Sequence, residues 1–254
     1  MTVTQRYLGN NWRKSALKLG ALGALLVTLP GCQSIEATNS NVAQVRFIDA
    51  SPDFYNPGLD FYINQTAALY NVGYGTHSSY ISVTPGTYSF AAAADGSTPT
   101  TTLVKTSATL LNGHTYSYVV GDLLANISGT LLQDQTQPAP SGEISVRFID
   151  QNDVIGAVDI YAIPSGATLL TTKPLLQDVT FGTVNGYLGI PSGSYTIAVL
   201  PTGTQPIATT VALYSAIPSG FTGTAGTVYT LFITDQQLTT TPGLNIFSVT
   251  DYPQ

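Results

Sequence analysis

Arginine and aspartate side chains occupy matching positions in two stretches of this 254-residue sequence. The pentapeptide VRFID occurs twice, and its arginine is Arg46 in the first occurrence and Arg147 in the second. Asp60 and Asp159 also correspond. An arginine and an aspartate on neighbouring strands can form a bidentate pair that fixes strand register. The sequence therefore predicts two structural pairs, Arg46 with Asp60 and Arg147 with Asp159, with a carboxylate-binding arginine as the alternative.

Further aspartates recur around the same pentapeptide, namely Asp49, Asp53, Asp150 and Asp153. Carboxylate oxygens are the ligands that Ca²⁺ prefers, and the ion takes six to eight of them. The sequence has no loop with the D-x-D-x-D-G spacing, and aspartate also favours turns by accepting hydrogen bonds from nearby backbone. We therefore expect no cofactor and retain calcium at these four residues as the less favoured hypothesis.

Residues for catalysis are scarce. His77 and His114 are the only histidines, and the second stretch has Val184 and Thr227 at the matching positions. A zinc site needs three or four protein ligands, and the sequence contains neither a G-x-S-x-G nucleophile elbow nor a glycine-rich phosphate loop after a strand. We expect a protein that is not an enzyme.

Aromatic side chains are the best candidates for a contact surface. Most tyrosines recur at strand positions and fit a role in packing. The non-repeated aromatic residues are the binding candidates, and they are Tyr55, Tyr70, Tyr74, Tyr214 and Phe221. The only tryptophan, Trp12, lies near the N-terminus, which weakens the alternative hypothesis of a glycan-binding pair of modules.

The N-terminus has the pattern of an export signal. Four basic residues and no acidic ones precede a short apolar run at 19–29, which is too short to span a bilayer, since a spanning helix needs about 20 residues. The run ends in LPGC, which resembles the lipobox of bacterial lipoproteins and implies acylation of Cys32, the only cysteine. By the same resemblance, Gln33 after the cysteine favours the outer membrane.

The charge balance limits the partners. The sequence carries eight basic and fourteen acidic residues, and half of the basic ones lie before Cys32. Four scattered cations cannot build the basic patch that nucleic acid binding requires. We expect attachment to the membrane through the acyl chains on Cys32, no nucleic acid, and an envelope or surface protein as the partner.

Long segments of the two stretches align, from the VRFID pentapeptides to GTYS at 86–89 and GSYT at 193–196. Short runs rich in valine, isoleucine, tyrosine and threonine alternate with glycine and proline at about ten-residue spacing. We predict an all-β chain with two tandem immunoglobulin-like β-sandwich domains, a small barrel being the alternative. The expected boundaries are 1–31 for the signal peptide, 32–42 for a flexible tether, 43–134 for domain 1, 135–142 for a linker and 143–254 for domain 2.

The repeated pattern resembles the bacterial domain of unknown function 4397. It runs from VRFIDASPD through LDFY and YGT to PGTY in the first stretch, whereas the second stretch has QND at 151–153 in place of ASPD. The resemblance implies exported or surface-attached β-sandwich domains, often in tandem, and no catalytic chemistry. Together these features predict a membrane-anchored lipoprotein of the cell envelope that presents two domains for protein interaction or envelope structure.

Overall fold

The structure, a computed structural model, describes residues 41–54, 56–210, 212, 220–236 and 243–253. These residues are almost all strand and connecting loop, with two short 3-10 helices, η1 (Pro52–Phe54) and η2 (Leu169–Thr171). They belong to one compact unit. Within the described ranges, no helix has the length and apolar character needed to cross a membrane.

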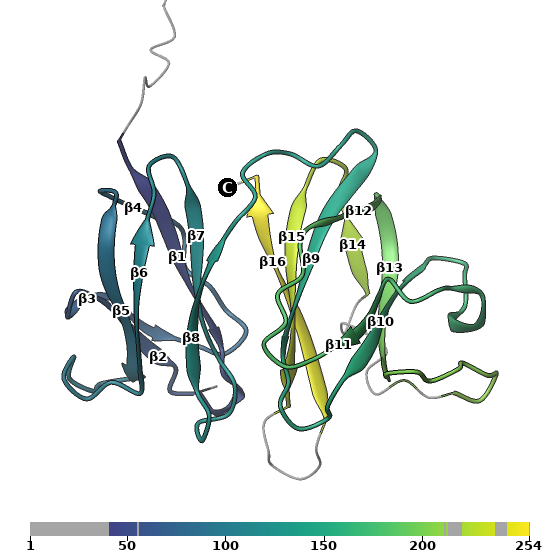
Figure 1. The fold of residues 1–254 in the computed structure, drawn as a ribbon, viewed down its shortest axis with the longest axis horizontal. Coiled ribbons are helices and arrows are strands. Elements are labelled where there is room, and N and C mark those ends of the chain that lie inside the picture. The colour runs from purple at the N-terminus through teal and green to yellow at the C-terminus, as the bar shows by residue number, and fades with distance from the viewer. Residues whose placement is uncertain (1–40, 55, 211, 213–219, 237–242, 254) are drawn as a thin grey trace, which may run out of the picture. The chain divides into compact units, whose positions relative to one another are not determined.

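The first half of the chain folds into two four-stranded sheets (Figure 1). One sheet has the order β4-β1-β7-β8, and its strands are Ile81–Val83, Ala43–Ala50, Thr115–Gly121 and Ser128–Gln133. The other has the order β3-β2-β5-β6, and its strands are Thr66–Val72, Leu59–Ile63, Gly86–Ala94 and Val104–Leu110. Strand β1 is parallel to β7 and antiparallel to β4.

The second half repeats this arrangement. Its first sheet has the order β12-β9-β15-β16, and its strands are Leu188–Pro191, Glu143–Gln151, Val228–Asp235 and Leu244–Tyr252. Its second sheet has the order β11-β10-β13-β14, and its strands are Leu176–Val179, Val158–Pro164, Gly193–Pro201 and Phe221–Gly223. The prediction of an all-β chain with two sandwich-like halves is confirmed.

The alternation of side chains along β1 explains why the sequence VRFID recurs. Val45 and Phe47 point into the apolar core of the first half, where the Phe47 ring lies 5.0 Å from that of Phe61. Arg46 and Ile48 lie on the opposite face of the same strand, and both are buried. A strand buried on both faces must have another layer beyond its own sandwich.

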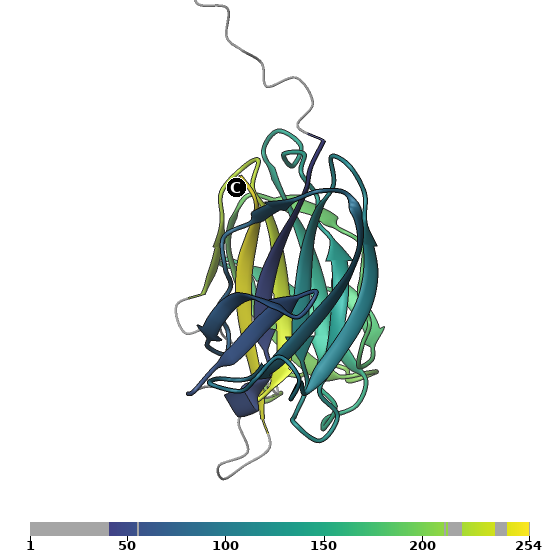
Figure 2. The ribbon, with the colours of Figure 1, turned by 90° about the vertical axis from the view of Figure 1, so that its left-hand side faces the viewer.

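That layer is the other half of the chain. A separate apolar cluster joins strands β1, β7 and β8 to strands β9, β15 and β16, and its members are Ile48, Ala50, Val119, Leu132, Ile149, Phe232 and Val249. We call the contact between these two sheets the seam. Figure 2, turned so that the first half faces the viewer, shows the strands of both halves running in similar directions. The pentapeptide therefore supplies the inner core and the seam with alternate residues.

One expected strand is not found where the sequence placed it. The pattern predicts a strand near 206–213, but the described residues 206–210 form turn and coil. The edge strand of that sheet is β14, which pairs with β13 through Phe221 opposite Tyr195. The Thr and Ala residues at 208–212 have the composition of a strand but supply no large side chain for the core. Phe221, which fills the core, comes later in the chain.

Candidate functional site at the seam

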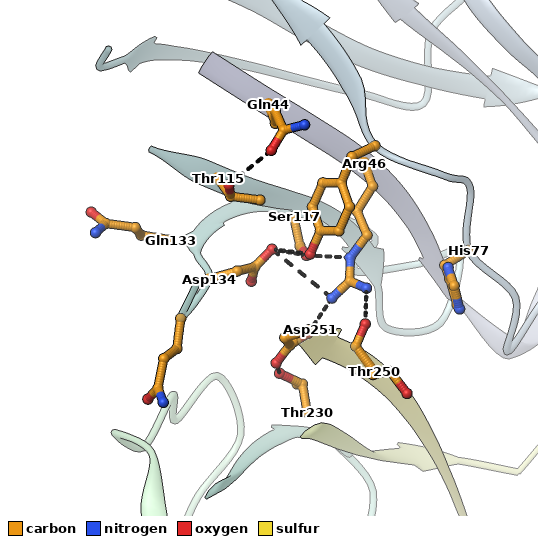
Figure 3. Close-up of polar contacts among 12 residues, drawn as sticks. Gln44, Arg46, His77, Thr115, Ser117, Gln133, Asp134, Thr230, Thr250 and Asp251 are labelled. Atoms are coloured by element: carbon orange, nitrogen blue, oxygen red, sulfur yellow. Dashed lines mark hydrogen bonds and ion pairs between the residues drawn. The ribbon is translucent and has the colours of Figure 1, made fainter. Parts of the chain in front are cut away.

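Arg46 crosses the seam and is fully engaged there (Figure 3). Its Nε donates to Ser117 Oγ at 2.8 Å within the first half. Its Nη1 donates to the carbonyl oxygen of Thr250 at 2.7 Å, and its Nη2 pairs with Asp251, both in the second half. The guanidinium carbon lies 4.7 Å from the ring centroid of Tyr80. All of these contacts are made by a side chain that is only 1% exposed.

Arg147 makes the same set of contacts in the opposite direction. Its Nε donates to Thr230 Oγ1 at 3.0 Å. Its Nη1 donates to the carbonyl oxygen of Gln133 at 2.9 Å, and its Nη2 donates to Asp134 Oδ1 at 2.7 Å. Its guanidinium carbon lies 4.6 Å from the ring centroid of Tyr187. Each half therefore gives its arginine to the aspartate of the other half.

The two aspartates hold further hydrogen bonds. Asp134 Oδ2 accepts from Ser117 Oγ at 2.6 Å and from Tyr80 at 2.9 Å. In the second half, Asp251 Oδ2 accepts from the hydroxyls of Thr230 and Tyr187 at 2.6 and 2.8 Å. We call Arg46–Asp251 and Arg147–Asp134 the crossed ion pairs. Two positive and two negative charges are buried together, so their cluster carries no net charge.

The surroundings shift the pKa values of these groups. Burial, followed by the negative charge of Asp134, raises the pKa of Asp251, while Arg46 and Arg147 act in the opposite direction. Burial lowers the pKa of Arg147, but Tyr187 and the two aspartates outweigh it and the net shift is upward. Burial is also the main reason why the pKa of Tyr80 and that of Tyr187 are raised. Both phenols therefore remain hydrogen-bond donors to the carboxylates.

The predicted pairs Arg46–Asp60 and Arg147–Asp159 are wrong, although the arginines do have a structural role. Asp60 lies on the outer face of the opposite sheet, where its carboxylate accepts from the backbone nitrogens of Asn71 and Gly96. Because Leu59 and Phe61 point into the core, strand alternation turns Asp60 away from it.

Asp159 follows the same rule in the second half. It accepts from the backbone nitrogens of Asp178 and Gly203 and from the Thr202 hydroxyl. The partners of Arg147 come instead from the last residue of β8 and the residue after it, and those of Arg46 in the second half come from β16.

Sequence reasoning missed Asp134 and Asp251. A signal for them existed, since LLQD at 131–134 and SVTD at 248–251 close the last strand of their respective halves with an aspartate. Asp134 is the last residue of predicted domain 1 and precedes a polar linker, where aspartates are common.

The four aspartates proposed as calcium ligands do not form one group. Asp49 Oδ1 and Asp150 Oδ1 each accept a backbone N–H two residues ahead, from Ser51 and Asn152. Asp53, by contrast, accepts the backbone N–H of Leu124.

Asp153 Oδ2 accepts from Asn126 Nδ2 at 2.9 Å across the seam. Among the residues that the structure describes, no set of three or more histidine, cysteine or acidic side chains is placed to hold a metal ion. Turn formation, the other hypothesis for these aspartates, accounts for the contacts of Asp49 and Asp150.

Burial acts strongly on two of these carboxyl groups. It raises the pKa of Asp49 to about 8 and that of Asp150 to about 7, against the smaller lowering effect of the backbone N–H that each accepts. The second oxygen of each, Oδ2, is buried and has no hydrogen-bond partner among the described residues. Both groups therefore hold a proton to a higher pH in the folded protein than an exposed aspartate does.

The aromatic binding candidates differ in their exposure and in their contacts. Tyr70 is 68% exposed on the edge strand β3 and stays a candidate. Tyr74 is half-buried, and its hydroxyl is already engaged within the molecule by Thr234 and Asn245 of the second half. Phe221 is wrong as a surface residue, since it is 4% exposed and packs edge to face on Tyr229.

Three predicted residues lie outside the described ranges. They are the lipidation candidate Cys32 and the binding candidates Tyr55 and Tyr214. The structure therefore leaves their predicted roles as predictions.

Comparisons with known proteins identify a family domain in part of this chain. No curated protein matches it. A solved structure described as "Alpha-glucan binding by a streptococcal virulence factor" has 10% sequence identity and a TM-score of 0.27, over 81% of this chain and 96% of that one. At that identity and TM-score the likeness carries no argument about a ligand. A family match covers the first half together with β9 and part of β10, and a DUF4397 domain, a domain of unknown function, is therefore found at residues 43–161.

Proposed function

We propose that this chain is a non-enzymatic lipoprotein of the bacterial cell envelope that presents a pair of β-sandwich domains for protein interaction or envelope structure. The observation that carries the proposal is the seam. The crossed ion pairs and the apolar cluster tie the two halves to each other at many points. A pair of domains held in this way suits display or structural support better than a mechanism that depends on domain closure.

The domain pair is best understood as a tandem duplication, with domains at 43–134 and 143–254 and a linker at 135–142. The same strand order in both halves supports this interpretation. So do the matching contacts of Arg46 and Arg147, each with a hydroxyl of its own half and an aspartate of the other. Two unrelated domains would have no reason to share these details.

The membrane attachment that we propose rests on the N-terminal sequence. The basic segment, the apolar run and LPGC suit cleavage before Cys32 and acylation of its thiol. Acyl chains would hold the protein through buried methylenes, each contributing about 0.8 kcal/mol. Gln33 after the cysteine supports the outer membrane as its location.

The contact surface that we favour for a partner protein is the edge strand β3. Its outer side is unpaired within its sheet, and Tyr70 presents a largely exposed ring there. A tyrosine combines a large apolar area with a hydroxyl, and such residues often dominate the binding energy of protein interfaces.

Two measurements test this proposal. Mass spectrometry of protein purified from cell envelopes should find Cys32 as the N-terminal residue with added acyl mass, whereas Cys32→Ser should remain unprocessed and leave the membrane fraction. Detection of an unmodified, soluble mature chain would overturn the anchor.

Cross-linking in intact cells then addresses the partner. The wild-type chain should give a defined cross-linked species that Tyr70→Ala removes. Leu170→Ala is the matched control, because Leu170 is also well exposed, at 54%, but lies in the second half. Equal loss of the species in both variants would contradict a contact through β3.

A further inference from the structure

A hollow opens at the seam beside the crossed ion pairs. It has a volume of about 470 Å³ and is lined by Gln44, Arg46, the segment 77–80, Thr250 and Pro253. Both halves therefore contribute to its wall, the second through the end of β16. This volume is within the range of roughly 300–1,000 Å³ that is usual for small-molecule sites. Figure 3 shows Gln44 and His77 on either side of Arg46.

A second hollow adjoins the first. Its volume is about 250 Å³, and its lining includes Gln44, Ser82, His114 and Thr115. Gln44 lines both hollows, so they follow one another along β1 and its edge neighbour β4. His77 lines one and His114 the other, and these are the only histidines in the sequence.

The first hollow has a mixed lining, with more apolar than polar surface, and it carries no free charge. Arg46 is its one charged lining residue, and this guanidinium is already engaged by Ser117, Thr250 and Asp251. An anionic ligand would have to compete with Asp251 for it. The site therefore does not favour a phosphate, a carboxylate or a nucleic acid.

Several lining groups retain unused hydrogen-bonding capacity. Within the described residues, no hydrogen bond is formed by Gln44 Nε2, His77 Nε2, Ser79 Oγ or Thr250 Oγ1. They comprise an amide donor, an imidazole nitrogen and two hydroxyls, which together both donate and accept. Tyr80 and Pro253 add ring surfaces beside them. Such a set matches a ligand that carries many neutral hydroxyl groups on a compact ring.

We propose that the two adjoining hollows bind a short segment of a neutral glycan, with His77 in the first hollow and His114 in the second as contact residues. This goes beyond the proposed anchored display function and does not depend on it. The arrangement also predicts one such site for each chain, because the matching positions in the second half have different side chains.

The backbone defines those matching positions. Ile48 forms an isolated bridge with His77, and Ile149 forms the same bridge with Val184. In the same way, the N–H of Gln44 bonds to the carbonyl of His114 at 3.0 Å, as that of Ser145 bonds to Thr227 at 3.1 Å. Val184 has no hydrogen-bonding group, and Ser145 is shorter than glutamine. Ser145 and Val184 can therefore serve as control positions for Gln44 and His77.

The two histidines make the test direct. The full chain, purified in detergent without a histidine tag and with isotope-labelled histidine, should give two imidazole signals, which His77→Ala and His114→Ala assign. Maltohexaose, cellohexaose and chitohexaose are then titrated separately at one fixed pH. With at least one of them, both signals should move to saturation with a common dissociation constant.

Substitutions locate the contact. Gln44→Ala and His77→Ala should each weaken binding of the active hexasaccharide about five- to tenfold, the loss expected when one hydrogen bond is removed. Ser145→Ala and Val184→Ala are the matched controls and should leave the dissociation constant unchanged. Circular dichroism in the near ultraviolet checks that all four variants keep the wild-type fold.

Three outcomes would overturn the proposal. One is the absence of any shift with all three sugars at millimolar concentration. Another is an equal loss of affinity in the control variants, which would place the sugar elsewhere. The third is saturable movement of the histidine signals by a short unstructured peptide or by hexagalacturonate but by none of the neutral sugars, which would assign the hollows to a peptide or an acidic glycan.

Discussion

At one position along β1 and β9 an arginine enters the seam and meets an aspartate of the other half, whereas three residues later Asp49 and Asp150 are buried with no such partner. Within the described residues, the ion pairs all involve Arg46 or Arg147. Asp134 and Asp251 thus share their burial with cations, and the two arginines counteract the upward effect of burial on the pKa of Asp251. Asp49 and Asp150 have no such cation, and burial raises their pKa values to about 8 and about 7.

The difference shows two ways in which a fold can hold a carboxyl group inside. A carboxylate opposite an arginine can remain ionised, but the pair then depends on both partners. A carboxyl group without a cation takes up a proton instead, and its burial then depends on pH. The stability that the first arrangement provides should respond most to mutation, and that of the second should respond most to pH.

The largest effect is expected from breaking one crossed ion pair. Arg46→Met removes the arginine that is hydrogen-bonded to Asp251 and leaves only Arg147 near it, at 3.8 Å, so the free energy of unfolding should fall by about 3–5 kcal/mol. Urea denaturation monitored by tyrosine fluorescence measures this loss. The double variant Arg46→Met/Asp251→Asn should lose less than the sum of the two single variants, because it removes the uncompensated charge. Strict additivity would mean that the pair is not coupled.

A smaller effect on the free energy of unfolding is expected from a change of pH. The pKa of Asp49 is about 8 in the folded chain and 3.8 as its ordinary value, so between these pH values the folded state binds more protons than the unfolded state. Stability should therefore fall as pH rises from about 4 to about 8. Asp150, Asp122 and Asp235 act in the same direction, since burial raises their pKa values as well.

Asp49→Asn should remove part of this dependence. The amide oxygen can still accept the N–H of Ser51, and the side chain no longer ionises. At about pH 8 the variant should be more stable than the wild type by about 1–3 kcal/mol, because the neutral amide avoids the cost of ionising a buried group, at about 1.4 kcal/mol per pKa unit, and its unpaired N–H groups offset part of that gain. Thermal melts at both ends of the pH range provide the measurement. A variant that is equally destabilised at every pH would show that the carboxyl group itself is required.

A still smaller loss of stability is expected when one phenol hydroxyl is removed. Tyr80→Phe removes the hydrogen bond to Asp134 but keeps the ring against Arg46. Its free energy of unfolding should fall by about 1–2 kcal/mol. Tyr187→Phe is the matched variant, because Tyr187 bonds to Asp251 in the same way. Similar losses in both support the equivalence of the two crossed pairs, and a loss in only one would break it.

The smallest effect, on the association of the two halves, is expected from cutting the linker. A protease site inserted between Pro140 and Ser141, both exposed, separates the halves covalently after folding. Because the seam is formed mostly by strand residues, the two pieces should elute together in size-exclusion chromatography. The same cut in the Arg46→Met background tests how much of this association depends on the crossed pairs. Separation of the wild-type pieces would show that the linker, and not the seam, holds the halves.

The all-β fold class was predictable from the sequence because it depends on local residue patterns. Valine, phenylalanine and isoleucine alternate with other residues between glycine turns, and this pattern alone predicts two sandwiches. The partners of Arg46 and Arg147 were not predictable in the same way. Their ion pairs join residues 205 and 13 positions apart, and they exist only because two sheets of different halves face each other.

Phe221 illustrates the same limit at the edge of a sheet. The sequence predicts Phe221 as a contact residue, yet three residues there pair with β13 and place the ring in the core. A short edge strand leaves almost no pattern in the sequence, because three residues carry too little alternation to recognise. Its position depends on which face of the sandwich still needs covering.

The parallel pairing of β1 with β7 has a mechanical consequence. The two strands are in register from Gln44 opposite Thr115 to Ala50 opposite Gly121, and their hydrogen bonds run across the strand direction. Tension applied to the chain ahead of Ala43 pulls β1 along its length and loads these bonds together in shear, so that they cannot break one at a time. A protein held by its N-terminal end would therefore meet an external pull at one of its most strongly paired strands.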